Sequence, residues 1–252
     1  MNVKGVDVSH HNGTIDWDKV KAAGVQFALL RASWGIESPK QIDSQFERNY
    51  SECKRLGIPV GAYHFSYAKS PAEAKKELEF FLKNLKGKQF EYPVMFDLED
   101  KTLLDLPKSV LTDNVIAFCD GLEKAGYYAA LYSNPDWLTQ RLDLEKIKRF
   151  DLWFADWRKN PSKAFPHGIW QYSETGRVNG ISGNVDLDIA YKDYPTIIKN
   201  AGLNGYSAKA DTYKVTAEIS GIPSAKAGTI KSACEQMGMP VCEFYINYVS
   251  KK

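Results

Sequence analysis

"YPVMFDLED" (residues 92–100) places a run of apolar residues directly before three acids. The apolar part is typical of a buried strand, and the acids lie where that strand ends. Residues two apart on a strand point to the same side, so Asp97 and Glu99 share one face while Phe96 and Leu98 share the other. A buried strand that ends in two carboxyl groups on one face predicts a site of acid chemistry.

Strand-like and helix-like segments alternate on both sides of this stretch. The first five strands are expected at 3–8, 25–32, 58–65, 92–98 and 127–133. Amphipathic helices are expected at 16–23, at 43–56, from Ser70 onward, at 110–125, and in part of the segment that runs to Arg149. Strands that alternate with helices favour a parallel sheet covered by helices.

The pattern changes after residue 150. Three more strands are expected at 151–157, 168–173 and 184–191, and the segments between them carry Gly and Pro without a helical period. Eight strands are the number that closes a barrel whose interior side chains can fill. The sequence therefore predicts an α/β fold, a modified TIM-like (βα)5β3 barrel.

A boundary follows the barrel. The segment 200–212 is rich in small and polar residues, as linkers are. Beyond it, a strand, a helix and a second strand predict a small α+β (βαβ) C-terminal domain. We expect the barrel at 1–199, the linker at 200–212 and the small domain at 213–252. A core this small rarely suffices alone, so we expect that domain to pack on the barrel or pair with a copy of itself.

Composition excludes several classes of function. The chain has 252 residues, 44% hydrophobic, with a formal net charge of +2. That charge is too small to favour nucleic-acid binding. No apolar run is long enough to span a membrane, so no membrane insertion is expected. The N-terminus lacks a long apolar segment, which predicts synthesis in the cytoplasm without a signal peptide.

The four cysteines have no metal-ligand spacing, and we expect neither a metal nor a cofactor. Cys53 and Cys119 are expected to be free thiols. For Cys234 and Cys242 a disulfide is an alternative to free thiols.

In an α/β barrel the active site lies where the strands end. The polar and aromatic residues expected at that rim are Asp7, Arg31, Tyr63, Asp97, Glu99, Tyr132, Trp157, Gln171 and Asp186. Crowded carboxyl groups cannot all ionise easily, so at least one pKa should rise. A carboxylic acid protonated near neutral pH can act as general acid toward a leaving sugar oxygen. The aromatic residues suit stacking on sugar rings.

Structural interpretations compete with the catalytic one. Asp97 and Glu99 could cap a helix or form ion pairs, but acids at two other strand ends favour catalysis. We interpret Asp100 and Asp188 as solvated or capping residues. His64 is consistent with a core position or with a place in the site.

Several blocks of the chain resemble glycoside hydrolase family 25, the Chalaropsis-type lysozymes of phage endolysins and bacterial autolysins. They are "KGVDVSHHNGTIDWDKVKAAGVQFALLRAS", "GIPVGAYHFSYA", "VMFDLED", "LWFADW" and "IWQYSETGRVNGISGNVDLDIAY". The resemblance runs in order from about residue 3 to residue 195. It implies a TIM-like barrel and an N-acetylmuramidase that cleaves the β-1,4 bond between N-acetylmuramic acid and N-acetylglucosamine.

The resemblance also implies roles for individual residues. Glu99 would be the general acid/base and Asp97 its partner carboxylate. Asp7 and Asp186 match the family's two other active-site aspartates, and Tyr63 matches a site aromatic. Position at the strand ends adds four expected substrate-binding residues, Arg31, Tyr132, Trp157 and Gln171.

The predicted function is therefore peptidoglycan hydrolysis by a phage-type endolysin that acts on the cell wall after release. Its partner would be bacterial peptidoglycan, and the small C-terminal domain would bind the wall or form a homodimer. One alternative is a catalytically silent wall-binding module. Another is a barrel glycosidase of different specificity, such as a chitinase, although the DxxDxDxE chitinase motif differs from "FDLED".

Overall fold

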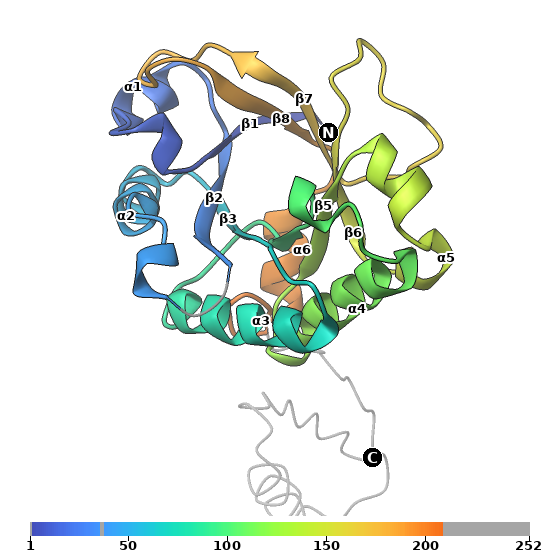
Figure 1. Ribbon diagram of the computed structural model, residues 1–252. Coiled ribbons are helices and arrows are strands. Elements are labelled where there is room, and N and C mark those ends of the chain that lie inside the picture. The colour runs from blue at the N-terminus through green and yellow to red at the C-terminus, as the bar shows by residue number, and fades with distance from the viewer. Residues whose placement is uncertain (1, 36–37, 209–252) are drawn as a thin grey trace, which may run out of the picture. The chain divides into compact units, whose positions relative to one another are not determined.

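The computed structural model describes residues 2–35 and 38–208, which form a closed barrel of eight strands with helices on its outside (Figure 1). Strand order in the barrel follows the chain, and the last strand returns to pair with the first. The strands are β1 (Val3–Val8), β2 (Phe27–Trp34), β3 (Val60–Phe65), β4 (Val94–Asp97), β5 (Ala129–Ser133), β6 (Asp151–Ala155), β7 (Ile169–Gly176) and β8 (Val185–Ala190). The α/β barrel expected from the sequence is confirmed.

Helices cover the outside of the sheet. The α-helices are α1 (Trp17–Ala22), α2 (Phe46–Leu56), α3 (Pro71–Leu85), α4 (Lys108–Lys124), α5 (Leu144–Ile147) and α6 (Tyr194–Ala201). Shorter turns are η1 (His10–Asn12), η2 (Pro39–Gln41), η3 (Lys101–Leu103) and the π-helical η4 (Trp137–Arg141). The fully described loops 156–168 and 177–184 contain no helix, as the sequence predicted. Within the described residues, no helix is both long enough and apolar enough to cross a membrane.

Strand β8 runs against the rest of the sheet. Strands β1 to β7 are parallel to one another, whereas β8 is antiparallel to both β7 and β1. The alternation of strands and helices had predicted a parallel sheet, so β8 departs from that expectation. The physical reason is the connection, because a parallel strand needs a long crossover and the short loop after β7 supplies only a reversal.

The two faces of the sheet form two separate cores. On β4, Met95 belongs to the cluster inside the barrel, while Phe96 and the following Leu98 belong to the cluster between sheet and helices. The barrel interior is filled by large side chains such as Phe27 and Trp153. Gly5 is required there, since an added Cβ would lie 2.4 Å from the Phe27 ring. The interior of the barrel is therefore a packed core and not a channel.

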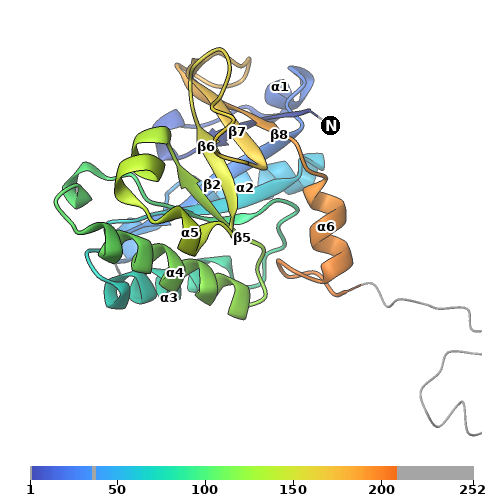
Figure 2. The same cartoon turned by 90° about the vertical axis from the view of Figure 1, so that its right-hand side faces the viewer.

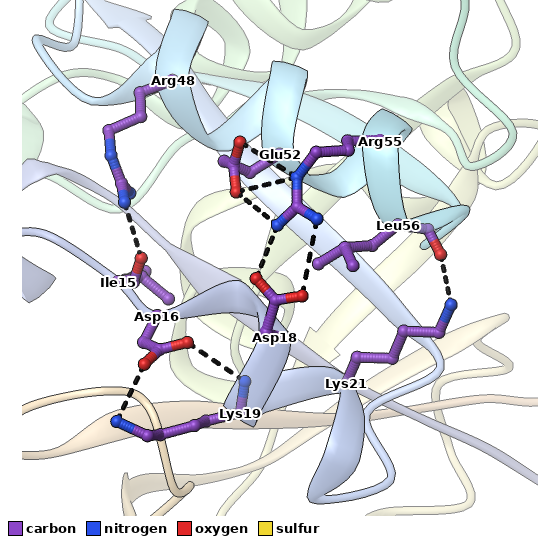
Figure 3. Close-up of polar contacts among 9 residues, drawn as sticks. All are labelled: Ile15, Asp16, Asp18, Lys19, Lys21, Arg48, Glu52, Arg55 and Leu56. Carbon is purple, nitrogen blue, oxygen red and sulfur yellow. Dashed lines mark hydrogen bonds and ion pairs between the residues drawn. The ribbon is translucent and has the colours of Figure 1, made fainter.

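Polar contacts join α1 to α2 on the outside of the barrel (Figure 3). Arg55 bridges Asp18 and Glu52, as Figure 3 shows. Trp17 Nε1 also donates to Asn49 Oδ1 at 3.0 Å. A recess of about 290 Å³ lies beside these contacts. Its charged lining residues all have partners within the protein: Asp16 with Lys19, Asp18 and Glu52 with Arg55, and Arg48 with the Ile15 carbonyl. The recess therefore offers no unpaired acid for catalysis.

Helix α6 closes one end of the barrel. Its residues Tyr194 and Ile198 pack into the interior cluster, and Figure 2 places the helix on the side where the N-terminus lies. The sequence had placed the linker from residue 200, but α6 continues to Ala201 and Asn204 is fully buried. Residues 209–212 of that linker, the domain predicted at 213–252, and Cys234 with Cys242 lie outside the described residues. Cys53 and Cys119 are free and buried, as expected.

Asn204 fastens the chain after α6 to the barrel. Its Nδ2 donates to the Tyr92 carbonyl at 2.8 Å, and its Oδ1 accepts from the Tyr128 amide at 2.7 Å. Its backbone bonds to Phe90 and Gly126. A φ of 55° suits Asn, which visits the left-handed region more readily than most residues. The Asn204 side chain therefore links the segments that lead into β4 and β5 to the chain after α6.

We predict that Asn204→Ala lowers the free energy of unfolding by about 2–4 kcal/mol, because a buried amide and a buried carbonyl lose their partners. Urea denaturation monitored by tryptophan fluorescence measures the change. Asn200→Ala is the matched control, since Asn200 lies exposed on α6 and should change stability by less than about 0.5 kcal/mol. Equal effects in the two variants would contradict the role given to Asn204.

Candidate active site

The sheet register gathers carboxyl groups at the other end of the barrel. Asp7 near the end of β1 lies opposite Asp186 near the start of β8, and Asp97 at the end of β4 lies beside Tyr132 of β5. Glu99 follows two residues after Asp97 and faces the same side. The four acids predicted from the sequence are therefore brought to one mouth, and the pKa of each is affected by at least one of the others.

The pKa values of Glu99, two residues after β4, and of Asp186, on β8, are raised. Burial, then the charges of Asp186, Asp100 and Glu174, raise the pKa of Glu99 to about 7, although a Tyr132 hydrogen bond opposes the shift. Burial raises the pKa of Asp186 to about 6. Glu99 can therefore carry a proton near neutral pH, which a general acid requires.

Asp97 lies deeper than Glu99. Its side chain is only 4% exposed, and its Oδ1 has no hydrogen-bond partner. Burial and the neighbouring Glu99 charge raise the pKa of Asp97, while the Arg31 charge opposes this rise. A buried carboxyl oxygen without a partner is costly, so it indicates a group that a ligand or a proton completes.

Gln171 connects the acids to the aromatic residues. Its Nε2 donates to Asp7 Oδ2 at 2.8 Å, and its Oε1 accepts from the Tyr132 hydroxyl at 3.1 Å and from Trp157 Nε1 at 3.2 Å. Two donors at one oxygen settle the orientation of the amide. Gln171 thus fixes the direction of the Asp7 carboxyl from β7, across the intervening β8.

The predicted aromatic residues lie at two depths. Tyr63 and Tyr132 are 7% and 5% exposed and meet the Trp153 ring edge-on, with ring centroids at 5.4 and 4.5 Å. Trp157 is 52% exposed. The two tyrosines therefore form the floor of the mouth, and Trp157 presents an indole face at its rim.

Arg31 is held by an acid that sequence reasoning missed. Its Nε donates to Asp43 Oδ2 at 3.0 Å, and its guanidinium lies 5.1 Å from the Trp34 ring centroid. Asp43 also accepts from the His10 amide. The sequence had placed Asp43 in a helix, but α2 begins at Phe46, which leaves Asp43 free to turn toward the barrel.

Glu174 was also missed. It lies on β7 and contributes to the raised pKa values of Glu99 and Asp186. The strand was expected to end at residue 173, but it continues to Gly176. Because β7 is irregular after Gln171, side-chain alternation could not have placed Glu174.

The interpretation of Asp188 as a solvated residue is wrong. Asp188 is fully buried and accepts from Trp153 Nε1 at 2.7 Å. The reason is the direction of β8: an antiparallel strand enters at the mouth, so Asp188 lies one inward position deeper than Asp186. Asp100, by contrast, caps η3 by accepting from the Thr102 amide, as expected.

His64 is a core residue. It is fully buried on the helix-facing side, with Nδ1 2.9 Å from Ser33 Oγ and Nε2 3.4 Å from Glu77 Oε2. Ser33 and Glu77 are also fully buried. The three side chains resemble a hydrolytic triad in composition, but burial prevents any substrate from reaching them.

An α/β barrel with clustered acids at its mouth, one of them with a pKa near 7, has the arrangement typical of glycoside hydrolases. Comparison with known families agrees: the model of glycosyl hydrolases family 25 matches residues 6–181. The chain belongs to this family.

Similar proteins are lysozymes and an endolysin. The autolytic lysozyme of Clostridium acetobutylicum is 29% identical over 74% of this chain, and the match spans 55% of that protein's length. A Streptomyces coelicolor lysozyme of known crystal structure is 28% identical with a TM-score of 0.69, and the match covers 80% of this chain and 97% of that protein's chain. The CTP1L endolysin is 28% identical with a TM-score of 0.70, covering 79% of this chain and 70% of its own.

We predict that Gln171→Leu lowers the free energy of unfolding by about 2–4 kcal/mol, because Tyr132, Trp157 and Asp7 lose one partner each. Chemical denaturation at constant pH measures the change. Gln140→Leu is the matched control, since Gln140 is exposed in η4. If both variants had the stability of the wild type, the hydrogen bonds of Gln171 would not stabilise the fold, and the prediction would be wrong.

Proposed function

We propose that the chain is an N-acetylmuramidase, a lysozyme that cleaves the β-1,4 bond between N-acetylmuramic acid and N-acetylglucosamine in bacterial peptidoglycan. The main observation behind this proposal is that Asp97 lies beside Glu99, whose pKa is near 7, and that Asp7 and Asp186 lie at the same mouth. Membership of the family and the likeness to lysozymes support the same reaction.

Glu99 is the proposed general acid/base. In its protonated form it gives a proton to the leaving sugar oxygen, and as a carboxylate it then removes a proton from the attacking water. Asp97 stabilises the positive charge that develops on the sugar ring. Asp7 and Asp186, on the opposite side of the mouth, position the substrate.

The remaining predicted residues are proposed to bind the glycan. Trp157 stacks on a sugar ring at the rim, because its indole is half exposed. Tyr63, Tyr132 and Gln171 form the surface below the scissile bond. Arg31, already paired with Asp43, contributes positive charge beside Asp97.

The finer architecture and biology are part of the proposal. The order of strands and helices supports a (βα)5β3 barrel, with five βα units before three strands joined without helices. The likeness to the CTP1L endolysin supports a phage endolysin that acts on the cell wall. The segment 213–252 is proposed to bind the wall or to form a homodimer.

We predict that Glu99→Gln lowers the rate of cell-wall hydrolysis at least about 10²-fold, because the amide cannot donate or accept the catalytic proton. For the unmodified protein, kcat/KM should fall as pH rises through about 7, where Glu99 loses its proton. Release of soluble wall fragments measures both effects. Asp105→Asn is the control, since that acid is exposed and is not among the groups that raise the pKa of Glu99, and it should keep most of the activity.

The chemical identity of the product decides the specificity. Digested walls are reduced with borohydride, and the sugar alcohol at the new ends is identified. Muramitol is expected. Glucosaminitol would instead show that the enzyme is a glucosaminidase. Wall binding without new reducing ends would favour the catalytically silent wall-binding module.

We predict that deletion of residues 213–252 lowers wall binding or halves the mass of the particle in solution. Pull-down with purified walls and light scattering measure the two properties. The barrel should keep its fold, because the described contacts of Asn204 lie before the deletion. Unchanged binding together with unchanged mass would refute both roles of the segment.

A further inference from the structure

Asp188 is a buried acid to which the proposed reaction gives no role. It is fully buried, and Trp153 Nε1 donates to its Oδ1 at 2.7 Å. Its Oδ2 has no hydrogen-bond donor. A carboxylate buried in this way would be costly, so the free oxygen requires either a cation or a proton.

The group next to Asp188 is the Asp7 carboxyl. The register places Asp188 opposite Gly5 and Asp186 opposite Asp7, and both acids of β8 face the interior. Asp7 and Asp188 therefore lie on adjacent strands, two positions apart on the same inward face, and a side-chain hydrogen bond between their carboxyl groups contributes to the pKa of each. Two ionised carboxylates cannot form that bond, because neither carries a donor. The contact therefore requires a proton between them.

The groups that face this pair favour the protonated form. From β6, β7 and β5 the neighbours are Trp153, Gln171 and Tyr132, which are neutral donors. Asp186 of β8 adds negative charge. Tyr63 of β3 is also a neighbour, since the Asp7 charge contributes to its raised pKa. The cation of β2, Arg31, is bound to Asp43.

Electrostatics agree with the geometry. Burial, together with the nearby carboxyl charges, raises the pKa of Asp188 to about 8 and raises that of Asp7 well above its ordinary value. Acids that share a site are expected to release their protons in coupled steps.

We propose that Asp188 is a positioning residue that shares a proton with Asp7 and so holds the Asp7 carboxyl in its place at the mouth. Asp7 is fixed from two sides, by the Gln171 amide and by the shared proton. The consequence for the reaction rests on the proposed muramidase function, whereas the shared proton itself does not.

Two substitutions separate this role from simple packing. Asp188→Asn has nearly the same shape, can accept from Trp153, and carries N–H donors toward Asp7 at every pH. Asp188→Ala removes both interactions. We expect kcat/KM for wall hydrolysis to fall at least about tenfold in Asp188→Ala and to be largely restored in Asp188→Asn, because the amide replaces the shared proton.

The proton is tested without any activity measurement, in the full chain. Asp188 binds its proton more tightly in the folded than in the unfolded protein, so its contribution to stability is lost as pH rises from about 4 to about 8. Asp188→Asn has no such proton. We compare the urea concentration at the unfolding midpoint in Asp188→Asn with that of the wild type. The midpoint of the variant relative to the wild type should therefore increase from pH 4 to pH 8 and then stay constant.

Asp156→Asn is the matched control, a buried carboxyl whose pKa is lowered by hydrogen bonding to Arg158. Its stabilising effect is present above the unfolded pKa, so this variant should be less stable than the wild type, by a constant amount from about pH 5 to pH 8. A pH-independent midpoint difference for Asp188→Asn would overturn the shared proton.

The outcomes also separate this inference from the proposed function. A pH-dependent midpoint difference in a protein that hydrolyses no wall would leave the shared proton intact and reject the muramidase. Full activity in a folded Asp188→Ala would reject the positioning role and leave the muramidase intact. Equal loss of activity in the Asn and Ala variants would also reject positioning through a shared proton.

Discussion

The antiparallel pairing of β8 between β7 and β1 is the constraint on which the site depends. It closes the barrel, and its register sets Asp186 opposite Asp7 and Asp188 opposite both Gly5 and Gln171. A slip of one residue would turn both acids of β8 toward the outer face. The packed interior resists that slip, because Phe27 already fills the space beside Gly5. Core packing at the centre of the barrel thereby sets which carboxyl groups meet at its mouth.

Neutral donors, rather than cations, surround most of these acids. Gln171 and Trp153 donate to Asp7 and Asp188, and the pKa values of both acids are raised. Asp156 has an Arg158 partner, and its pKa is lowered. The same protein therefore tunes carboxyl groups in opposite directions through the choice of partner. Acids that keep protons near neutral pH suit proton transfer, while paired carboxylates such as Asp156 fasten loops.

Much of the barrel and of the mouth could be predicted because alternation along a strand is a local property. Asp97 and Glu99 could be assigned to the inward face from Phe96 and Leu98 alone, and the outer cluster contains both apolar residues. Asp188 was misplaced because its depth depends on the direction of β8, which is set by pairing with distant strands. Alternation places Asp186 and Asp188 on one face without indicating which lies nearer to solvent.

Helix α6 was missed although its local signals are present. Asp193 caps the Thr196 amide, Pro195 lies in the first turn, and Gly202 ends the helix in the left-handed region. The small polar residues that follow resemble a linker because Asn204 and Gly205 adopt positive φ angles in a tight turn. Composition alone does not separate a flexible connection from a turn that is buried against the barrel. The difference lies in tertiary hydrogen bonds such as that from Asn204 to Tyr92.

The depth of each acid in the barrel limits the chemical role that it can have. Glu99 and Asp186 are partly exposed, Asp7 and Asp97 are 5% and 4% exposed, and Asp188 is fully buried. Only a group that reaches solvent can exchange protons with substrate and water in each turnover. A fully buried acid can act on the reaction through its neighbours alone. The gradient therefore separates the four carboxyl groups of the proposed reaction from the deeper Asp188, and it follows from strand direction and register rather than from residue type.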